Sequence, residues 1–296
     1  MGSVSLGVWR SDSLLPKILP GLGPRLPGIS DNYVANFLSD GFLTPTLGLM
    51  DTETAARQAA SHLSRLKADE FEVFASRNRK LQVEARDQKI ETFTQASDVG
   101  LAIRLIKDQR LGFSYTTALT EAAVKAAAES ALEIAKAMPE DPHLGFATFS
   151  RNHYSRANAP IHDATGLTVA TAQKIELARE LEAACLRADS RIKAVRSAHF
   201  SENEWESLLL DSTGSKLEEA GSRFSLSLTC KAEENGDAQM GGDFSFSPTL
   251  SELALEVTAV RAAHYATELL GAGSGPTRVM PAVFRNSVVA ELLEFL

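Results

Sequence analysis

Histidines and cysteines are the side chains whose spacing would reveal a metal site or a reactive thiol in this sequence. A zinc peptidase helix needs two histidines on one face with a glutamate beside the first, as in HExxH. None of the six histidines is followed by glutamate, and no two lie four or five residues apart. They are His62, His143, His153, His162, His199 and His264. The sequence therefore predicts no metal ligand in this chain.

Nucleophile patterns are equally sparse. The segments around Ser114 and Ser215 are not GxSxG elbows. Cys185 and Cys230 fall on the apolar faces of a predicted helix and a predicted strand, which is typical of inert core thiols. The glycine-rich run 271–275 follows a predicted helix and lacks the GK[ST] ending of a phosphate loop, so it indicates a flexible linker. We expect no catalytic residue, and the sequence identifies no substrate-binding residue.

The charge balance argues against a nucleic-acid partner. Lys and Arg number 30 against 38 Asp and Glu, a formal charge of −8 that repels phosphate backbones. The densest basic run, 77–80, lies between two strand-like stretches and is interpreted as a solvated turn. Arg104, on an apolar strand, could anchor a carboxylate, although a structural ion pair is the simpler interpretation.

Three features of the sequence bear on where the protein is located: the number of cysteines, the length of its apolar runs and the composition of its amino terminus. Two cysteines far apart in the sequence are too few for a disulfide scaffold and fit a reducing compartment. No apolar run approaches the roughly 18–20 residues that span a bilayer. Residues 1–10 lack the basic start and continuous apolar core of a signal peptide. We expect a cytoplasmic protein that does not enter the membrane.

The predicted helices and strands, which would position any site, occur in groups along the chain and do not form a regular βαβ repeat. Helical periodicity predicts helices over about 52–67, capped by Thr52 or Thr54, and over 120–137, 169–187 and 251–270, with a further helix at the end of the chain. Strands are predicted over 71–75, 81–85, 90–93, 100–106, 111–115, 208–211, 222–232 and 279–284. Turns are expected at 87–88, 108–109, 213–215 and 235–236. The predicted class is α+β, with antiparallel β-meanders packed against long amphipathic helices.

Residues 1–49 differ in composition from the rest. Prolines and glycines alternate there, and no helical or strand period lasts a full element, so we expect a mobile extension. Met50 is then a candidate for the authentic start. The alternative is a tail that docks through a short helical patch over 14–19. The predicted division is 1–49 extension, 50–270 α+β domain, and 271–296 the start of a carboxy-terminal domain that this chain lacks.

Three stretches, taken in order, carry a resemblance to a known family. The first runs over 72–76, 81–91 and 100–113, the second over 174–182 and 189–192, and the third from 211–214 to 281–284. Together they resemble the PmbA branch, also called TldE, of the TldD/PmbA metalloprotease family, sometimes labelled modulators of DNA gyrase. The resemblance covers about residues 51–296.

This resemblance implies a cytoplasmic heterodimer that degrades or trims peptides and small unfolded proteins. In the TldD-like partner of such a pair, an HExxxH helix and a further cysteine hold the metal, expected to be zinc. The corresponding stretch here, 285–291, contains no histidine. The implied role is a non-catalytic, substrate-handling subunit that holds no cofactor itself and acts with a TldD-like subunit and peptide substrates.

Two rival hypotheses stay open at this point. One is a peptide- or protein-binding module, of the gyrase-modulator kind, with no role in proteolysis. The other is a hydrolase whose catalytic residues all lie beyond Leu296. Whether the chain is itself an enzyme is therefore left undecided by the sequence.

Overall fold

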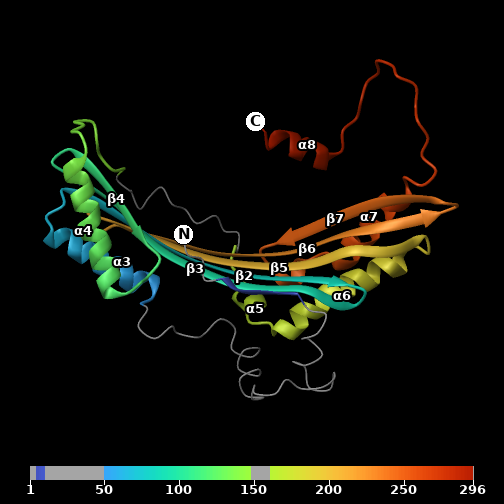
Figure 1. Ribbon diagram of the computed structural model, residues 1–296, viewed down its shortest axis with the longest axis horizontal. Helices are drawn as coiled ribbons and strands as arrows, with labels where there is room; N and C mark the ends of the chain where they lie inside the picture. The colour runs from blue at the N-terminus through green and yellow to red at the C-terminus, as the bar shows by residue number, and fades with distance from the viewer. Residues whose placement is uncertain (1–4, 11–49, 148–160, 296) are drawn as a thin grey trace.

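A single antiparallel sheet runs the whole length of the molecule. The computed structural model describes residues 5–10, 50–147 and 161–295. The strand order is β1-β3-β2-β5-β6-β7, with β4 also paired to β3. The strands are β1 (Ser5–Arg10), β2 (Glu70–Arg86), β3 (Lys89–Lys107), β4 (Arg110–Thr116), β5 (Ile192–Asp211), β6 (Lys216–Glu234) and β7 (Asp237–Ser247). Figure 1 shows them as a long curved band.

The predicted basic turn at 77–80 is wrong, because β2 continues through it. Arg77 and Arg79 lie opposite Glu206 and Glu204 of β5 in the register of the sheet. The Arg79 Nη1 to Glu204 Oε2 distance is 3.0 Å, and the Arg77 Nε to Glu206 Oε1 distance is 3.5 Å. Cross-strand pairs of opposite charge stabilise an antiparallel ladder, so these basic residues extend the strand. Likewise, the strands expected over 90–93 and 100–106 are one strand, β3.

Three of the expected turns are present as hairpin turns, and the positive φ predicted for Asn235 and Gly236 is confirmed. Asp87 and Gln88, and likewise Asp108 and Gln109, have positive φ at both positions. Asn235 and Gly236 do the same between β6 and β7. Positive φ at both central residues matches the right-handed twist of the flanking strands. These turns fix the register of the sheet and confirm the meander.

The long helices form where they were expected. They are α3 (Thr52–Arg65), α4 (Glu121–Ala137), α6 (Thr171–Ala188) and α7 (Leu255–Thr267), with short elements α5 (Ala164–Leu167) and η1 (Leu250–Glu252). The cap of α3 is Asp51, not a threonine: its Oδ1 accepts from the Thr54 backbone N–H at 2.7 Å. Helix α7 begins later than predicted, because η1 occupies the first residues of that range.

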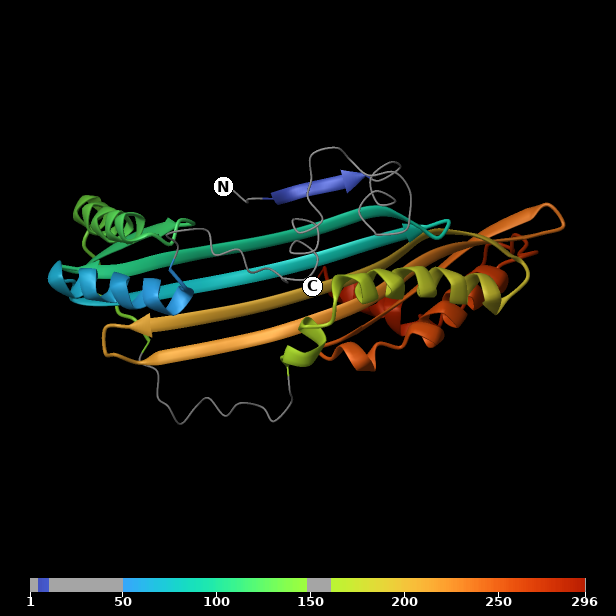
Figure 2. The same ribbon diagram turned by 90° about the horizontal axis from the view of Figure 1, so that it is seen from below.

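Two hydrophobic cores lie under one face of the sheet, one at each end. In Figure 2, helices α3, α6 and α7 lie in front of the strands on that face. The first core joins α3 and α4 to β2, β3 and the end of β5, and the second joins α6 and α7 to β2, β5 and β6. Strands β2 and β5 therefore belong to both cores. The paired arginines and glutamates of β2 and β5 lie between the two.

A glycine brings a helix into contact with the sheet in each core. A Cβ built at Gly112 of β4 would lie 2.0 Å from the Ala131 carbonyl oxygen of α4. A Cβ at Gly241 of β7 would lie 2.2 Å from the Ala266 nitrogen and 2.6 Å from the Ala262 oxygen of α7. No side chain fits at such distances, so both positions require glycine. This close approach sets how tightly α4 and α7 pack on the edge strands.

The ends of the chain depart from the predictions. Strand β1 pairs antiparallel with β3, so the expectation that residues 1–49 contain no complete element is wrong for Ser5–Arg10. The rest of that extension lies outside the described residues. The predicted strand over 279–284 is not formed: this stretch is irregular, and Val279 and Val283 are fully exposed. Helix α8 (Asn286–Leu293) follows it, on the concave side of the sheet in Figure 1.

Glu182 of α6 holds the β2–β3 hairpin, and its loss is expected to loosen that turn. The carboxylate is 1% exposed and accepts from the Asp87 N–H at 2.6 Å, the Gln88 N–H at 2.8 Å and the Gln88 side-chain amide at 2.9 Å. Hydrogen bonds to a charged group contribute about 1.5–3 kcal/mol. We expect Glu182→Ala to lower the free energy of unfolding by about 2 kcal/mol, measured by urea denaturation.

A matched variant separates the hydrogen bonds from the packing of this side chain. Glu182→Gln keeps the volume and one acceptor, so it should lose about half as much. Amide hydrogen exchange at Asp87 and Gln88 should accelerate in the alanine variant. Equal stability of the alanine variant and the wild type would contradict the role assigned to this carboxylate.

Candidate functional site

The histidines do not converge on a common centre. His62 and His264 lie on different helices, His199 lies on β5, and His143 and His162 lie in exposed positions outside any helix or strand. His153 lies outside the described residues. Within residues 5–10, 50–147 and 161–295, no group of three or more His, Cys, Asp or Glu side chains could hold a metal ion.

The two cysteines are core thiols, as predicted. Cys185 on α6 and Cys230 on β6 are both fully buried and free. The Cys230 thiol donates to the Ala262 carbonyl of α7 at 3.4 Å. The neighbouring Cys230 side chain and burial both raise the pKa of the Cys185 thiol. A protonated, enclosed thiol is a poor nucleophile.

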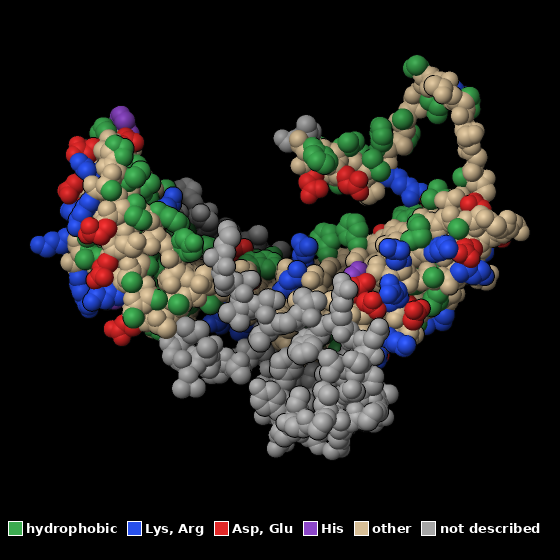
Figure 3. Space-filling model, viewed as in Figure 1, with side chains coloured by type: hydrophobic (Ala, Val, Ile, Leu, Met, Phe, Trp, Pro, Cys, Tyr) green, Lys and Arg blue, Asp and Glu red, His purple; other side chains and the backbone are tan. Residues whose placement is uncertain are grey.

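The sheet face opposite the two cores carries the candidate site. This face is the concave side of the band in Figure 1, and we refer to it as the concave face. It presents five large aromatic side chains that are 46–63% exposed: Phe74, Phe113, Tyr115, Phe244 and Phe246. In Figure 3, hydrophobic side chains gather on the concave side of both arms. Exposed apolar patches of this kind mark places where other molecules bind.

One aromatic cluster surrounds a pocket at the α4 end of the concave face. The pocket has a volume of about 520 Å³. Strands β2, β3, β4 and β5 supply Glu72, Phe74, Ala102, Arg104, Phe113 and Leu209, and the segment after α4 supplies Gly145, Phe146 and Ala147. The register explains the grouping: Phe74 lies opposite both Ala102 and Leu209, and Arg104 lies opposite both Glu72 and Phe113.

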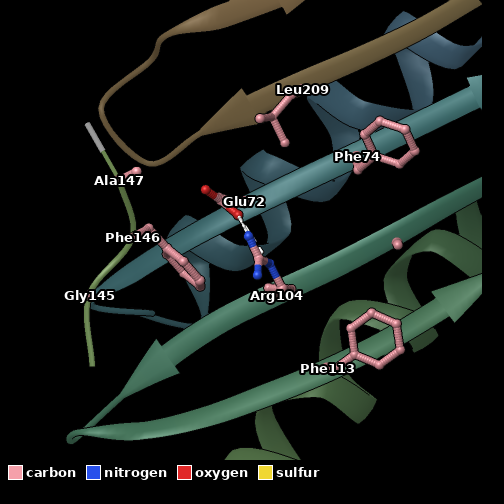
Figure 4. Close-up of a pocket in the computed structure, with 9 residues that line it drawn as sticks. Glu72, Phe74, Arg104, Phe113, Gly145, Phe146, Ala147 and Leu209 are labelled. Carbon is pink, nitrogen blue, oxygen red and sulfur yellow. Dashed lines mark hydrogen bonds and ion pairs between the residues drawn. The ribbon is translucent and has the colours of Figure 1, made fainter. Parts of the chain in front are cut away.

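Arg104 is the one basic residue among those that line this pocket. Its Nε lies 3.1 Å from Glu72 Oε2, and its Nη2 contacts the same oxygen. The guanidinium carbon lies 5.1 Å from the centre of the Phe146 ring. Figure 4 shows Arg104 and Glu72 pointing toward each other from neighbouring strands, with Phe146 beside them. The structural ion pair predicted for Arg104 is therefore present, but in the wall of a pocket.

The second aromatic cluster lies at the other end of the concave face, on edge strand β7. Phe244 and Phe246 stack with ring centres 6.3 Å apart and planes inclined by 10°. The Arg223 guanidinium of β6 lies 5.8 Å from the Phe246 ring centre. Trp205 lies between the two clusters, over Gly221, where any Cβ would collide with the indole. The concave face thus offers aromatic contacts at both ends.

Sequence reasoning missed these residues. The predicted strand over 71–75 placed Phe71, Val73 and Ala75 on one face, which is the buried face in the structure. Because side chains alternate along a strand, Phe74 had to point to the opposite, solvent-exposed face. A large aromatic side chain on that face was the signal in the sequence that could have indicated a binding surface. The position of Phe146 beside Arg104 had no signal, because it depends on the path of the segment after α4.

Comparison with known proteins places the chain in a family. Residues 71–135 match the PmbA/TldA metallopeptidase domain 1, and residues 165–270 match the PmbA/TldA metallopeptidase central domain. The two matches follow one another and together cover more than half of the sequence. The chain belongs to the PmbA/TldD metallopeptidase family.

The curated relatives lie on the PmbA branch. The chain is 28% identical over 243 residues to the metalloprotease PmbA of Escherichia coli O157:H7, covering 81% of this chain and 53% of that protein. It is 27% identical over 245 residues to a PmbA homolog of Haemophilus influenzae, covering 81% and 54%. The chain therefore spans about half the length of these relatives.

Solved structures share the fold. A putative modulator of DNA gyrase from Thermotoga maritima superposes with a TM-score of 0.64 at 16% identity, covering 76% of this chain and 50% of that one. TldE from Thermococcus kodakarensis gives a TM-score of 0.60 at 21% identity, covering 72% and 46%. The predicted α+β class is confirmed. None of the helices in the described residues is long and apolar enough to cross a membrane.

Proposed function

We propose that this chain is the substrate-handling part of a PmbA-type subunit in a cytoplasmic metallopeptidase complex. It binds peptides and unfolded segments on its concave face and presents them to a metal, expected to be zinc, held by a TldD-like partner. The observation that carries this proposal is the concave face itself, with exposed aromatic clusters at both ends of one long sheet.

An extended peptide suits this surface for two reasons. Aromatic side chains give large contact areas to many different residues, so they tolerate varied sequences. Strand β7 is the last strand in the order of the sheet, so its outer edge is available for main-chain pairing within the described chain. Strand addition provides affinity through main-chain hydrogen bonds, whatever the side chains. Both features favour a general peptide binder.

The division of labour with a partner is supported by the sequence around α8. In the TldD-like subunit, the expected HExxxH helix occupies the position of this stretch. Residues 285–291 contain one acidic residue, Glu291, and no histidine. A metal bound by the partner would supply the activated water, while this chain holds the substrate.

Peptide binding to the β7 end of the concave face tests the proposal. We expect Phe244→Ala/Phe246→Ala to weaken binding of an unfolded model peptide about tenfold, or about 1.4 kcal/mol, measured by fluorescence anisotropy with the full-length protein. Val257→Ala/Val260→Ala is the matched control, because these side chains are similarly exposed on the outer face of α7. Equal affinities of the two double variants would argue against the concave face.

The same protein separates the proteolytic role from binding alone. We expect the full-length chain to cut no peptide by itself and to support cleavage when mixed with a TldD-like subunit. Loss of cleavage in the Phe244→Ala/Phe246→Ala variant of the complex would connect the concave face to proteolysis. If binding persists but the complex cuts at a rate that does not depend on this subunit, the chain is a binding module alone.

A further inference from the structure

We propose that the Arg104 pocket recognises the carboxy-terminal residue of a peptide, with the terminal carboxylate at Arg104 and a large apolar side chain between the phenylalanines. The inference rests on the proposed peptide-handling function and assigns the end of the peptide that this pocket takes. In this proposal, the α4 end of the concave face is a subsite that binds the carboxy terminus of the peptide.

The charged group that the pocket exposes most is the Arg104 guanidinium. The Arg104 side chain is 55% exposed, whereas the Glu72 side chain that pairs with it is only 5% exposed. Two further carboxylates lie nearby but do not line the pocket: Glu70 accepts from the Phe146 N–H at 2.9 Å, and Asp211 accepts from the Thr213 and Ser215 N–H groups. An incoming anion therefore faces a guanidinium whose counter-ion lies behind it.

Arg104 also keeps donors free for a second carboxylate. Both contacts to Glu72 come from Nε and Nη2 and reach the same oxygen, Oε2. Within the described residues, Nη1 donates no hydrogen bond. A guanidinium has five N–H donors in a flat fork, so one Glu72 oxygen leaves most of the fork available. Paired bonds from arginine to a carboxylate are about twice as strong as neutral ones.

The rest of the pocket is apolar and suits the side chain of the last residue. Phe74 and Phe113 come from the two strands that flank β3, and Leu209 extends the apolar wall onto β5. The Phe146 ring lies beside the guanidinium, with its centre 5.1 Å from the guanidinium carbon. A volume of about 520 Å³ is within the range of small-ligand pockets, with room for a terminal residue of phenylalanine or leucine size.

A peptide terminus fits these features better than an internal segment. The main chain of an internal residue offers only a neutral carbonyl to Arg104, which forms a weaker bond than a carboxylate. An acidic side chain would meet the guanidinium but would leave the three phenylalanine rings without an apolar partner. A terminal apolar residue offers a carboxylate to the Arg104 guanidinium and an apolar side chain to the phenylalanine rings at the same time.

Anisotropy with amino-terminally labelled peptides tests this inference on the full-length protein. One peptide ends in Leu-Phe with a free acid, one has the same sequence with a carboxy-terminal amide, and one ends in Leu-Ala as a free acid. We expect the amide and the alanine peptide each to bind at least about tenfold more weakly than the first, or about 1.4 kcal/mol.

Matched variants assign the discrimination to the pocket. Glu72→Gln/Arg104→Gln replaces the ion pair with a neutral polar pair and should make acid and amide bind equally. Phe113→Ala should abolish the preference for phenylalanine over alanine and keep the preference for the acid. Val260→Ala, on the outer face of α7 and away from the concave face, should leave both preferences unchanged.

The outcomes distinguish this inference from the function on which it rests. If wild-type protein binds acid and amide equally well, the pocket does not read a terminus, and the proposed peptide-handling function stands. If the acid preference survives in Glu72→Gln/Arg104→Gln, another group reads the carboxylate and the inference is wrong. If no peptide binds, both proposals fail.

Discussion

Replacing Leu228 with aspartate is expected to unfold the β6 end of the sheet, with a loss of at least about 4 kcal/mol in the free energy of unfolding. Leu228 is 3% exposed and belongs to the core that α6 and α7 cover. Its cross-strand neighbours are Ala198 of β5 and Asp243 of β7. Asp243 already has a buried Oδ2 without a hydrogen-bond partner. A second carboxylate beside it would add like-charge repulsion to the cost of burial.

The neighbouring position is the control for this substitution. Ser227 points to the concave face, between His199 and Phe244, and is only partly buried. Ser227→Asp should therefore cost less than about 1 kcal/mol. Thermal denaturation followed by circular dichroism measures both variants. Equal melting temperatures would mean that the register of β6 is not the one described.

Replacing Lys174 with methionine is expected to lower the free energy of unfolding by about 3–5 kcal/mol at neutral pH. The Lys174 Nζ lies 2.5 Å from Glu202 Oε2, and the two side chains are 4% and 6% exposed. Lys174 also donates to the Leu167 carbonyl at 2.9 Å. Methionine removes the cation and leaves the carboxylate buried without its counter-charge, which accounts for most of the loss.

The loss should depend on pH in a defined direction. Burial raises the pKa of Glu202 above its usual value, and Lys174 opposes that rise. Without Lys174 the folded-state pKa rises further, so the folded protein binds a proton at pH values where the unfolded chain has released it. Stability then falls as pH rises from the unfolded pKa, about 4.3, to the folded pKa. Urea unfolding at pH 5 and pH 8 should show a smaller deficit at pH 5.

A double variant separates the lost ion pair from lost packing. Lys174→Met/Glu202→Leu removes both charges and fills a similar volume, so it should recover most of the stability lost in Lys174→Met. If the double variant is as unstable as the single one, or if the deficit of the single variant is the same at pH 5 and pH 8, the buried charge is not the cause.

Local patterns in the sequence were enough to predict the face and turns of β6. The alternation over 222–232 places Phe224, Leu226 and Leu228 on one face, and all three are buried. The Asn235-Gly236 turn follows directly and has the expected positive φ at both residues. Here the residues that decide the structure lie within a few positions of one another, so a single stretch of sequence contains the information.

The failed predictions depend on partners that are distant in the sequence. Arg77 and Arg79 resemble a solvated turn until the glutamates of β5 are placed opposite them, and Arg79 pairs with a residue 125 positions away. The apolar alternation over 279–284 is typical of a strand, but a strand needs a neighbour to pair with, and the described chain places none there. The Arg104 pocket requires four strands and a loop to meet, which periodicity does not encode.

The separation between β2 and β5 has a consequence for synthesis on the ribosome. Strand β2 can pair with β3 as soon as the hairpin emerges from the ribosome. Its other edge stays unpaired until β5 has been synthesised, about 125 residues later, which takes roughly 6–25 s at typical translation rates. An unpaired strand edge is a template for aggregation with other nascent chains. The middle of that unpaired edge carries three basic residues, Arg77, Arg79 and Lys80. Their positive charges would repel the same residues in a second copy of β2. We therefore expect the basic run to disfavour pairing between nascent chains before it forms its ion pairs with β5.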